Sequence, residues 1–280
     1  MLFSSLTFLF YFLPCVILLY FAVPKRFRNI ILLFSSFVFY TWGEPRYIWL
    51  MLTGITNSFA AGLLIERFRK SIISKLTLII SSAISIGCLG WFKYAGFFAE
   101  NFSKLTGLSL PALNIALPIG ISFYTFQMLS YVIDVYRKEV PAQKNPVNLA
   151  LYVSLFPQLI AGPIVRYSDI AKQLENRTHS MEKAALGVRR FVTGLSKKIL
   201  IANILGELVA IFKASEEQSV LFFWMYAVAY VLHVYFDFSG YSDMAIGLGK
   251  IFGFDFLENF NYPYISSSIT EFWRRWHMSL

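Results

Sequence analysis

Apolar runs long enough to cross a lipid bilayer follow one another along most of this chain, and they constrain its fold more than any other feature. The first run, Leu2–Val23, is apolar almost from its start and is long enough to span a hydrocarbon core of roughly 30 Å. Of the 280 residues, 57% are hydrophobic and only 15% are charged, whereas a soluble domain carries about 25% charged residues. The sequence therefore predicts an all-α, polytopic transmembrane protein that forms a single domain over residues 1–280.

Short basic loops separate the apolar runs. Because Leu2–Val23 lacks a basic start, it predicts a retained first helix and not a cleaved signal peptide. Basic loops favour the cytoplasmic side, so the loops 24–29 and 66–75 place the N-terminus outside. The net charge of +9 lies mostly in such loops, which favours a lipid bilayer as the partner and argues against nucleic acid. The further expected spans are Ile30–Trp42, Tyr47–Ile65, Leu76–Phe92, Leu117–Tyr136, Ile199–Phe212 and Leu221–Phe238.

The alternation of spans and loops is interrupted in the middle of the chain. The stretch Ala95–Leu113 is weakly polar and is expected on the outer side. Val147–Val165 is long enough to cross, but it contains Pro157 and precedes the basic stretch Arg166–Lys198, so we interpret it as a re-entrant or broken segment that lines a cavity. An ordinary kinked span with a basic external loop is the alternative. Arg166–Lys198 mixes apolar and charged residues, which predicts one or two helices lying in the membrane interface.

Ionisable residues inside the spans mark cavities or pathways, because each costs roughly 2.5–3.5 kcal/mol to insert. His233 and Asp237 stand four residues apart, on one face of an expected helix. A carboxylate that holds the imidazole N–H fixes the tautomer that catalysis requires; the alternative is a buried pair that only satisfies itself. With Asp134, the same groups could also form the proton path of a transporter or channel.

The last ten residues, Glu271–Leu280, bring paired arginines next to a histidine. If the helix expected here continues, His277 shares a face with Arg274. A neutral imidazole can accept a proton from a hydroxyl, and arginine can hold a phosphate or stabilise a developing oxyanion. The alternative is an interfacial anchor of arginines and tryptophans. Ser268 or Thr270 is the expected N-cap of this helix.

Several other chemistries find no support in the sequence. It contains no Walker A motif, no GxSxG elbow and no cysteine or histidine pattern typical of a metal site. Cys15 and Cys88 both lie within apolar runs and suggest no disulfide. The small residues of Ser239–Phe254 have the wrong spacing for a nucleotide fingerprint, and they predict either close helix packing or another short span.

Several motifs taken together resemble the membrane-bound O-acyltransferases, and in particular the bacterial branch of alginate O-acetyltransferases (AlgI) and D-alanyl transferases (DltB). No single motif is specific, but together they cover most of the chain. They are Tyr40–Pro45, Gly90–Tyr94, Leu117–Gln127, Tyr131–Arg137, Phe156–Ile164, Phe236–Asp243, Gly253–Pro263 and Phe272–Leu280.

The resemblance implies transfer of an acyl group, by analogy acetyl, from a cytoplasmic thioester towards an extracytoplasmic polysaccharide or a secreted-side acyltransferase partner. The donor is a substrate resembling acetyl-CoA, with no bound cofactor, and the place is the bacterial cell membrane. His277 matches the first of two family histidines. The second belongs in a Trp-His-Gly-like segment that this sequence does not contain, and His233 does not match it. We therefore expect an incomplete domain, the N-terminal part of a longer member.

With this resemblance and the residue chemistry together, we assign expected roles to individual residues. His277 is the expected catalytic residue, with Arg274 and Arg275 as contacts of the donor or the oxyanion. The expected cavity-lining residues are Tyr124, Tyr131, His233, Asp237 and Asp243. A non-catalytic transporter or channel, or a truncated membrane scaffold, is the alternative function.

Overall fold

Helices form nearly all of the regular secondary structure. The computed structural model describes residues 2–107, 115–159, 162–217 and 219–279, and within these ranges the β structure is one isolated antiparallel bridge, between Phe260 and Trp276. The predicted all-α class is thus confirmed. The chain divides into two compact units: the first is Met1–Leu18, Ala161–Val165 and Asn176–Leu280, and the second is Leu19–Ile160 and Arg166–Glu175.

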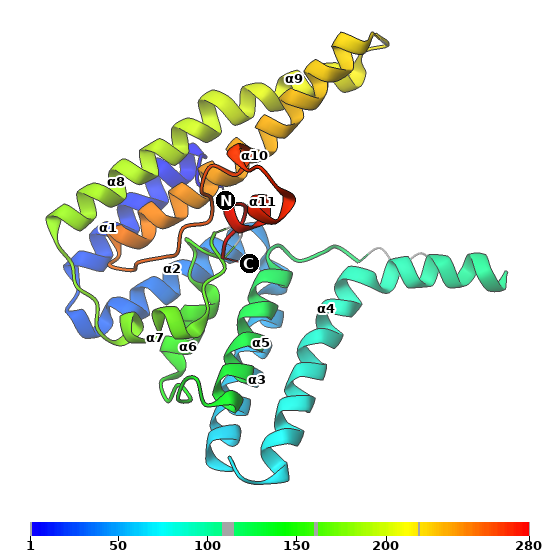
Figure 1. Cartoon of the computed structure of the whole chain (residues 1–280). Coiled ribbons are helices and arrows are strands. Elements are labelled where there is room, and N and C mark those ends of the chain that lie inside the picture. Colours follow the sequence, from blue (N-terminus) through cyan, green and yellow to red (C-terminus); the bar gives the residue numbers. More distant parts are fainter. Residues whose placement is uncertain (1, 108–114, 160–161, 218, 280) are drawn as a thin grey trace. The chain divides into compact units, whose positions relative to one another are not determined.

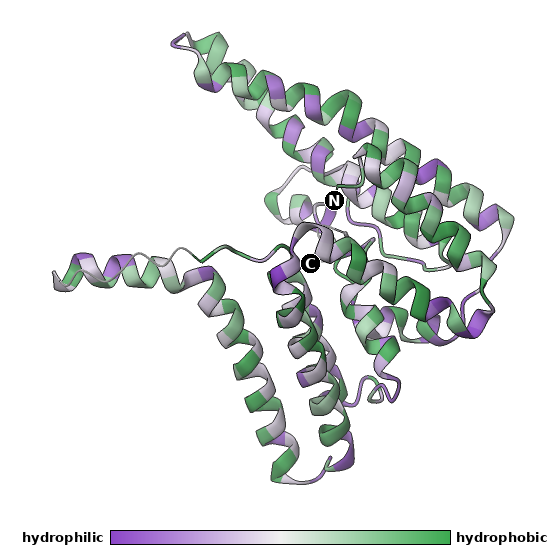
Figure 2. Cartoon of the chain, turned by 180° about the vertical axis from the view of Figure 1, so that it is seen from behind, coloured by the Kyte–Doolittle hydropathy of each residue, from purple (hydrophilic) through white to green (hydrophobic). Residues whose placement is uncertain are grey.

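Several helices have the length and the apolar composition of membrane spans. Among the described residues, three helices are long and apolar enough to cross a bilayer: Pro45–Arg67, Ile72–Thr106 and Val220–Ile251. Most of their residues are hydrophobic (Figure 2), and Leu221 and Trp224 are about 70% exposed. Soluble proteins rarely expose apolar patches of this extent, whereas hydrocarbon chains solvate them.

The second unit is a bundle of helices around a core rich in tyrosine. The helices α3, α4 and α5 pack against one another, and α2 packs against α6 (Figure 1). Tyr124, Tyr131 and Tyr152 are fully buried in this core. Helices form where spans were predicted over 30–42, 47–65 and 117–136, with small shifts of their ends. Of these three, within the described residues, the helix over 47–65 is the one long and apolar enough to cross a membrane. The helices are α2 (Arg28–Gly43), α3 (Ile48–Arg67), α4 (Ile72–Thr106), α5 (Ile121–Arg137), α6 (Pro146–Ser154) and α7 (Tyr167–Glu175).

The helix α4 is longer than predicted. We expected it to end near Phe92, but it continues to Thr106 and bends along its length (Figure 1). No proline interrupts this stretch, and Lys104 pairs with Glu100 one turn earlier at 2.6 Å, which supports the last turns. Gly107, in the left-handed region at φ +71°, ends the helix. Positions 108–113 of the stretch expected to be external lie outside the described residues.

The break predicted within 147–165 is confirmed. The helix α6 ends at Ser154, and residues 155–159 and 162–165 are not helical. Pro157 explains the stop, because proline disfavours helical geometry at the residue before it and cannot donate a backbone hydrogen bond. The side chains of Leu155 and Phe156 are fully buried. Irregular backbone at this position is thus enclosed by protein, as membrane-embedded segments require.

The first unit is built on two long helical runs that lie side by side (Figure 1). One is continuous from Met181 to Ala214, so the boundary predicted between an interfacial helix and a short span near Lys198 is wrong. The helices of this unit are η1 (Phe8–Phe12), the first part of α1 (Leu13–Ala22), α8 (Met181–Ser196), the π-helix η4 (Lys197–Ala202), α9 (Asn203–Ala214), α10 (Val220–Ile251), η5 (Pro263–Ile265) and α11 (Ile269–Arg275). The helices α7 and α8 agree with the prediction of one or two helices within 166–198, and their place in the membrane interface stays a prediction.

Glycines allow α8 and α10 to touch backbone to backbone. A Cβ atom on Gly194 would lie 2.5 Å from the carbonyl oxygen of Gly240, and one on Gly187 would lie 2.7 Å from that of Gly247. Both helices thus place a glycine every seven residues along the contact, which is the small-residue packing typical of membrane helices. Of the two interpretations of Ser239–Phe254, close helix packing is therefore the correct one.

The first apolar run forms a shorter helix than predicted. Residues 2–5 are not helical, and the Oγ of Ser5 accepts a hydrogen bond from the backbone N–H of Phe8 at 3.3 Å, at the start of the helix. The apolar helix then extends over Phe8–Ala22. Phe3, which was expected within the span, instead stacks on Tyr241 of α10 with ring centroids 4.6 Å apart.

Candidate active site

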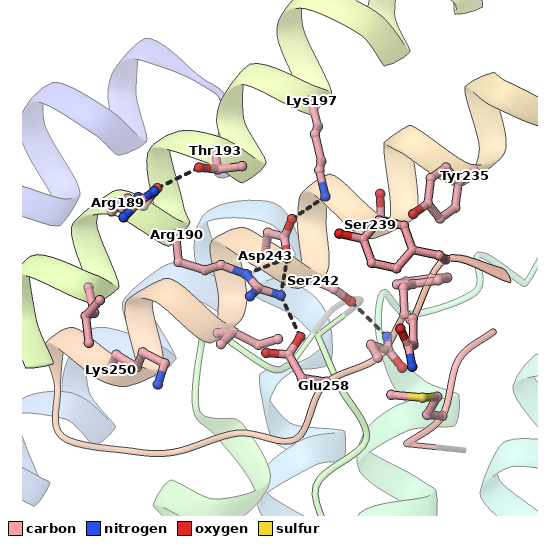
Figure 3. A pocket seen from close by; sticks show the side chains of 17 residues that line it. Arg189, Arg190, Thr193, Lys197, Tyr235, Ser239, Ser242, Asp243, Lys250 and Glu258 are labelled. Carbon is pink, nitrogen blue, oxygen red and sulfur yellow. Dashed lines mark hydrogen bonds and ion pairs between the residues drawn. The ribbon is translucent and has the colours of Figure 1, made fainter. Parts of the chain in front are cut away.

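A polar cavity of about 680 Å³ lies between α8, α10 and the segment 258–262 (Figure 3). Its volume is within the range of small-molecule sites. Its wall combines four basic side chains, Arg189, Arg190, Lys197 and Lys250, with only two carboxylates, Asp243 and Glu258. The other lining residues are Leu186, Thr193, Tyr235, Ser239, Ser242, Ile246, Asn259, Phe260, Asn261, Tyr262 and Met278.

A buried carboxylate organises the basic wall. Asp243 is 5% exposed, and its Oδ1 lies 2.6 Å from Nη2 of Arg190 while its Oδ2 lies 2.6 Å from Nζ of Lys197. Nη2 of Arg190 also lies 2.5 Å from Glu258 (Figure 3). Arg189, by contrast, is exposed and makes no ion pair within the described residues. The cavity therefore keeps an excess of positive charge, with Arg189 as an uncommitted cation.

The π-helix η4 supplies two of the ion pairs that join the helical runs. Its wider turn presents Lys197 and Lys198 in succession, and they pair with Asp243 and Asp237 of α10. At its other end, Nδ1 of His233 donates to the carbonyl oxygen of Ala202 at 2.8 Å. Single-turn π segments of this kind are frequent at functional sites.

The predicted pair of His233 and Asp237 is not formed. Each group has its own partner on η4, the carbonyl of Ala202 and the ammonium of Lys198 respectively. Neither residue belongs to the wall of the cavity. The two residues do lie four apart on one helix, but Nδ1 of His233 and Oδ1 of Asp237 each bind a partner on the neighbouring helical run instead of each other.

The last segment of the chain turns back instead of continuing as a helix. Ser268 caps α11 by accepting from the N–H of Glu271 at 3.1 Å, as predicted, but the helix ends at Arg275. Trp276 is extended and bridges to Phe260, and His277 has φ +49°. The prediction that Arg274 and His277 share a helix face is therefore wrong.

The imidazole of His277 is half-buried against α10. Its ring meets that of Phe238 edge to face, with centroids 4.9 Å apart. Nε2 is buried and has no hydrogen-bond partner in the part of the chain that the structure describes. Burial lowers the pKa of His277 below its usual value, so the neutral form is favoured. Its neighbour Met278 lines the cavity.

The two arginines before His277 differ in their surroundings. Arg275 forms an ion pair with Glu271 at 2.8 Å, and its Nη1 donates to the carbonyl oxygen of Asn261 at 3.2 Å. Its guanidinium thus holds α11 to the segment 259–261. Arg274 is exposed and has no ion pair among the described side chains.

The remaining predicted site residues are divided between the units. Asp243 lies in the wall of the polar cavity. Tyr131 is in the core of the second unit, where its hydroxyl accepts from the N–H of Gln143 at 3.0 Å. Tyr124 belongs to the same core and lines a smaller cavity of about 60 Å³. Asp134 is also buried in this unit. Neither Tyr124 nor Tyr131 is among the residues that line the polar cavity.

Sequence reasoning missed most of the side chains that form the polar wall. Arg190 and Lys197 belong to the basic stretch 166–198, which was predicted as interfacial without singling them out. Glu258 and Asn259 carry no local signal, since they lie in a loop and act through partners far away in the sequence. Within the described residues, no group of three or more His, Cys, Asp or Glu side chains has the arrangement of a metal site.

Comparison with known proteins places this arrangement in one family. A model of the membrane-bound O-acyltransferase family, MBOAT, matches residues 137–280. The matched range includes α8, α10, the polar cavity and His277.

The chain is also similar along its whole length to curated bacterial proteins. It is 45% identical to the "Probable alginate O-acetylase AlgI" of Pseudomonas aeruginosa and 33% identical to the "Peptidoglycan O-acetyltransferase" of Helicobacter pylori, with 100% of this chain covered in both cases. It spans only 55% and 59% of their lengths. Over 61% of the chain, it is 32% identical to the "Teichoic acid D-alanyltransferase" of Bacillus subtilis, of which 44% is covered. With its apolar helices, the chain is a membrane protein, and it belongs to the membrane-bound O-acyltransferase family.

Proposed function

We propose that this chain is part of a membrane-embedded O-acyltransferase that moves an acetyl group from a cytoplasmic thioester donor towards an extracytoplasmic polysaccharide. Family membership implies an acyl donor. The observation that carries the proposal is His277, whose buried Nε2 is unpaired among the described residues, beside a cavity with an excess of basic side chains.

His277 has the properties of a general base. An imidazole that is to take a proton from an acceptor hydroxyl must be neutral and must present an unprotonated ring nitrogen. Burial favours the neutral form of His277, and Nε2 has no hydrogen bond within the described ranges that would occupy it. Such a base contributes typically 10²–10⁴-fold to the rate.

The polar cavity suits the anionic part of a thioester donor. Thioester carriers bear phosphate groups, and clustered cations in a cleft of low dielectric attract them. Arg189 is the first candidate for this contact, because it is the cavity's cation without an ion pair among the described groups. Arg274 is a second candidate for a donor or oxyanion contact, whereas we assign Arg275 to holding the segment 259–261.

The names of the relatives support the acceptor class that we propose. Those with the higher identities are named as acetylating enzymes of alginate and of peptidoglycan. We propose a polysaccharide acceptor, reached directly or through an acyltransferase partner on the outer side of the membrane. Acetyl is proposed over D-alanyl because the D-alanyltransferase matches a smaller part of this chain at lower identity.

We further propose the cell membrane as the location, with the N-terminus outside and the loops 24–29 and 66–75 in the cytoplasm. After replacement of Cys15 and Cys88 by alanine, a membrane-impermeant maleimide should label Lys104→Cys in intact cells, but Lys25→Cys only after lysis. Labelling of Lys25→Cys in intact cells would refute this orientation.

The decisive experiment compares two histidines. The gene is deleted and restored as wild type, His277→Gln or His233→Gln, and base-labile acetyl is measured in exopolysaccharide, peptidoglycan and teichoic acid fractions. An acyltransferase predicts loss of acetyl with His277→Gln and retention with His233→Gln, whose amide can still donate to Ala202. The fraction that loses acetyl identifies the acceptor.

A transporter or channel predicts the opposite pattern. His233 and Asp237 would then be essential, and His277 would tolerate replacement. Each of these two polar groups of α10 has a partner on η4, which is the arrangement of a helix contact and not of an open proton path. Full acetylation in the His277→Gln strain, at wild-type protein level, would overturn the acyltransferase assignment.

A further inference from the structure

A buried amide, Asn259, connects the segment that carries His277 to α10. Asn259 is 1% exposed. Its Nδ2 donates to Oγ of Ser242 at 2.8 Å, and its Oδ1 accepts from Oγ of Ser279 at 2.9 Å. Ser242 belongs to α10, and Ser279 follows His277 by two residues. A buried amide that uses both its donor and its acceptor fixes the positions of both partners.

The backbone around Asn259 brackets His277 on both sides. The N–H of Met278 donates to the carbonyl oxygen of Asn259 at 3.0 Å, and the N–H of Asn261 donates to that of Arg275 at 2.9 Å. The histidine between these two bonds has φ +49°. A non-glycine residue keeps such a backbone only where its surroundings enforce it, at a cost of about 1–3 kcal/mol.

The same network reaches a third part of the first unit. Oγ of Ser279, besides donating to Asn259, accepts from the N–H of Ile164 at 2.9 Å. Ile164 lies in the irregular stretch 162–165. The position of the His277 turn is therefore defined relative to both α10 and this stretch through Asn259 and Ser279.

We propose that Asn259 is the positioning residue of His277: its side chain, held by Ser242, sets the turn that directs the imidazole onto Phe238. This inference rests on the proposed function, in which His277 is the general base. Asn259 acts through Ser279 and the backbone, and we assign it no contact with the reacting atoms. A displacement of about 1 Å at a catalytic group can lower the rate about 100-fold.

The three histidines of the chain make a direct test practical. The 280-residue chain, with labelled histidine side chains, is studied by NMR in detergent micelles, and the signals are assigned with His179→Gln, His233→Gln and His277→Gln. Asn259→Ala is expected to shift the His277 signals and leave the other two in place. Ser266→Ala is the matched control, because it removes a hydroxyl bond of the same region, to Pro263, that does not contact the turn.

Each outcome decides the proposal. Unchanged His277 signals in a folded Asn259→Ala chain would overturn it. If all three histidine signals move, the variant has lost its fold, and Ser242→Ala and Ser279→Ala decide instead. Each of these removes one of the two side-chain bonds of Asn259, so a shift confined to His277 supports the proposal and no shift in either refutes it.

Acyl transfer by the enzyme provides a separate readout. Asn259→Ala is expected to lower kcat about 100-fold with little change in KM, because the cavity that receives the donor keeps its charges. If His277→Gln retains activity while Asn259→Ala still shifts the His277 signals, the proposed function fails and the positioning of the imidazole stands. The two failures are thus distinguishable.

Discussion

The guanidinium of Arg190 lies 2.6 Å from the carboxylate of Asp243, and this ion pair joins α8 to α10 beside the polar cavity. Asp243 is almost completely buried, whereas the side chain of Arg190 is 36% exposed. The carboxylate therefore depends on its two cations, while the cations remain partly hydrated. Because of this difference in burial, replacing the carboxylate should affect stability more than replacing either cation.

Replacement of Asp243 by asparagine should destabilise the first unit. The change leaves Arg190 and Lys197 partly buried without their shared counter-charge. Breaking a fully buried pair costs about 3–5 kcal/mol, and partial exposure of the cations reduces this to about 1–3 kcal/mol. Denaturant unfolding in detergent measures the difference. Asp255→Asn is the matched control: its carboxylate also pairs with two lysines, but it is 57% exposed, so its loss should cost less than about 1 kcal/mol.

Gly194→Ala should separate α8 from α10. The added Cβ would lie 2.5 Å from the carbonyl oxygen of Gly240 and 2.7 Å from the backbone nitrogen of Met244, which cannot move independently of the helix. Overpacking of this kind costs about 1–3 kcal/mol. Gly87→Ala is the control, because a Cβ there meets nothing within 4 Å and favours the helix. A lower melting temperature for Gly194→Ala alone is the expected result; equal melting temperatures would contradict the close contact.

Local patterns in the sequence were sufficient for most of the helices. Apolar runs bounded by proline, glycine and basic residues predicted α2, α3 and α5, and Pro157 predicted the break after α6. The continuity of α8, η4 and α9 was not predictable in this way. The two consecutive lysines, Lys197 and Lys198, indicated the end of a helix. Their counter-charges, Asp243 and Asp237, lie 46 and 39 residues away in the sequence, so no local pattern shows that the lysines are paired within a continuous helical run.

The geometry of the candidate site could not be predicted from local sequence patterns either. The motif around His277 was visible, but its geometry depends on pairing with the segment 259–261, which no periodicity reveals. A helical register was the reasonable expectation for Phe272–Leu280, and the bonds from Asn259 and Asn261 override it. Likewise, spacing on α10 placed His233 and Asp237 on one face without showing that η4 would engage each of them.

The stability of the first unit should depend on pH through His277. Burial lowers the pKa of its imidazole in the folded state, while the unfolded value is about 6.5. Below about pH 6.5 the unfolded chain therefore binds more protons, and stability falls until the pH reaches the folded pKa. Above pH 6.5 the contribution is fully present. The difference in unfolding free energy between wild type and His277→Gln, followed from pH 8 to pH 5, measures it; a difference independent of pH would contradict a lowered pKa.

Arg189→Gln should weaken binding of the donor without changing the chemical step. Arg189 is exposed in the wall of the cavity and has no ion pair among the described residues, so its charge is available to a phosphate. Loss of one charged hydrogen bond costs about 1.5–3 kcal/mol, which raises KM for the thioester at least about 10-fold while kcat is unchanged. Lys104→Gln, which removes an exposed cation at the end of α4 in the other unit, is the control and should leave KM at the wild-type value. An equal KM for Arg189→Gln and wild type would exclude Arg189 from the donor site, whereas a fall in kcat alone would place it at the reacting group.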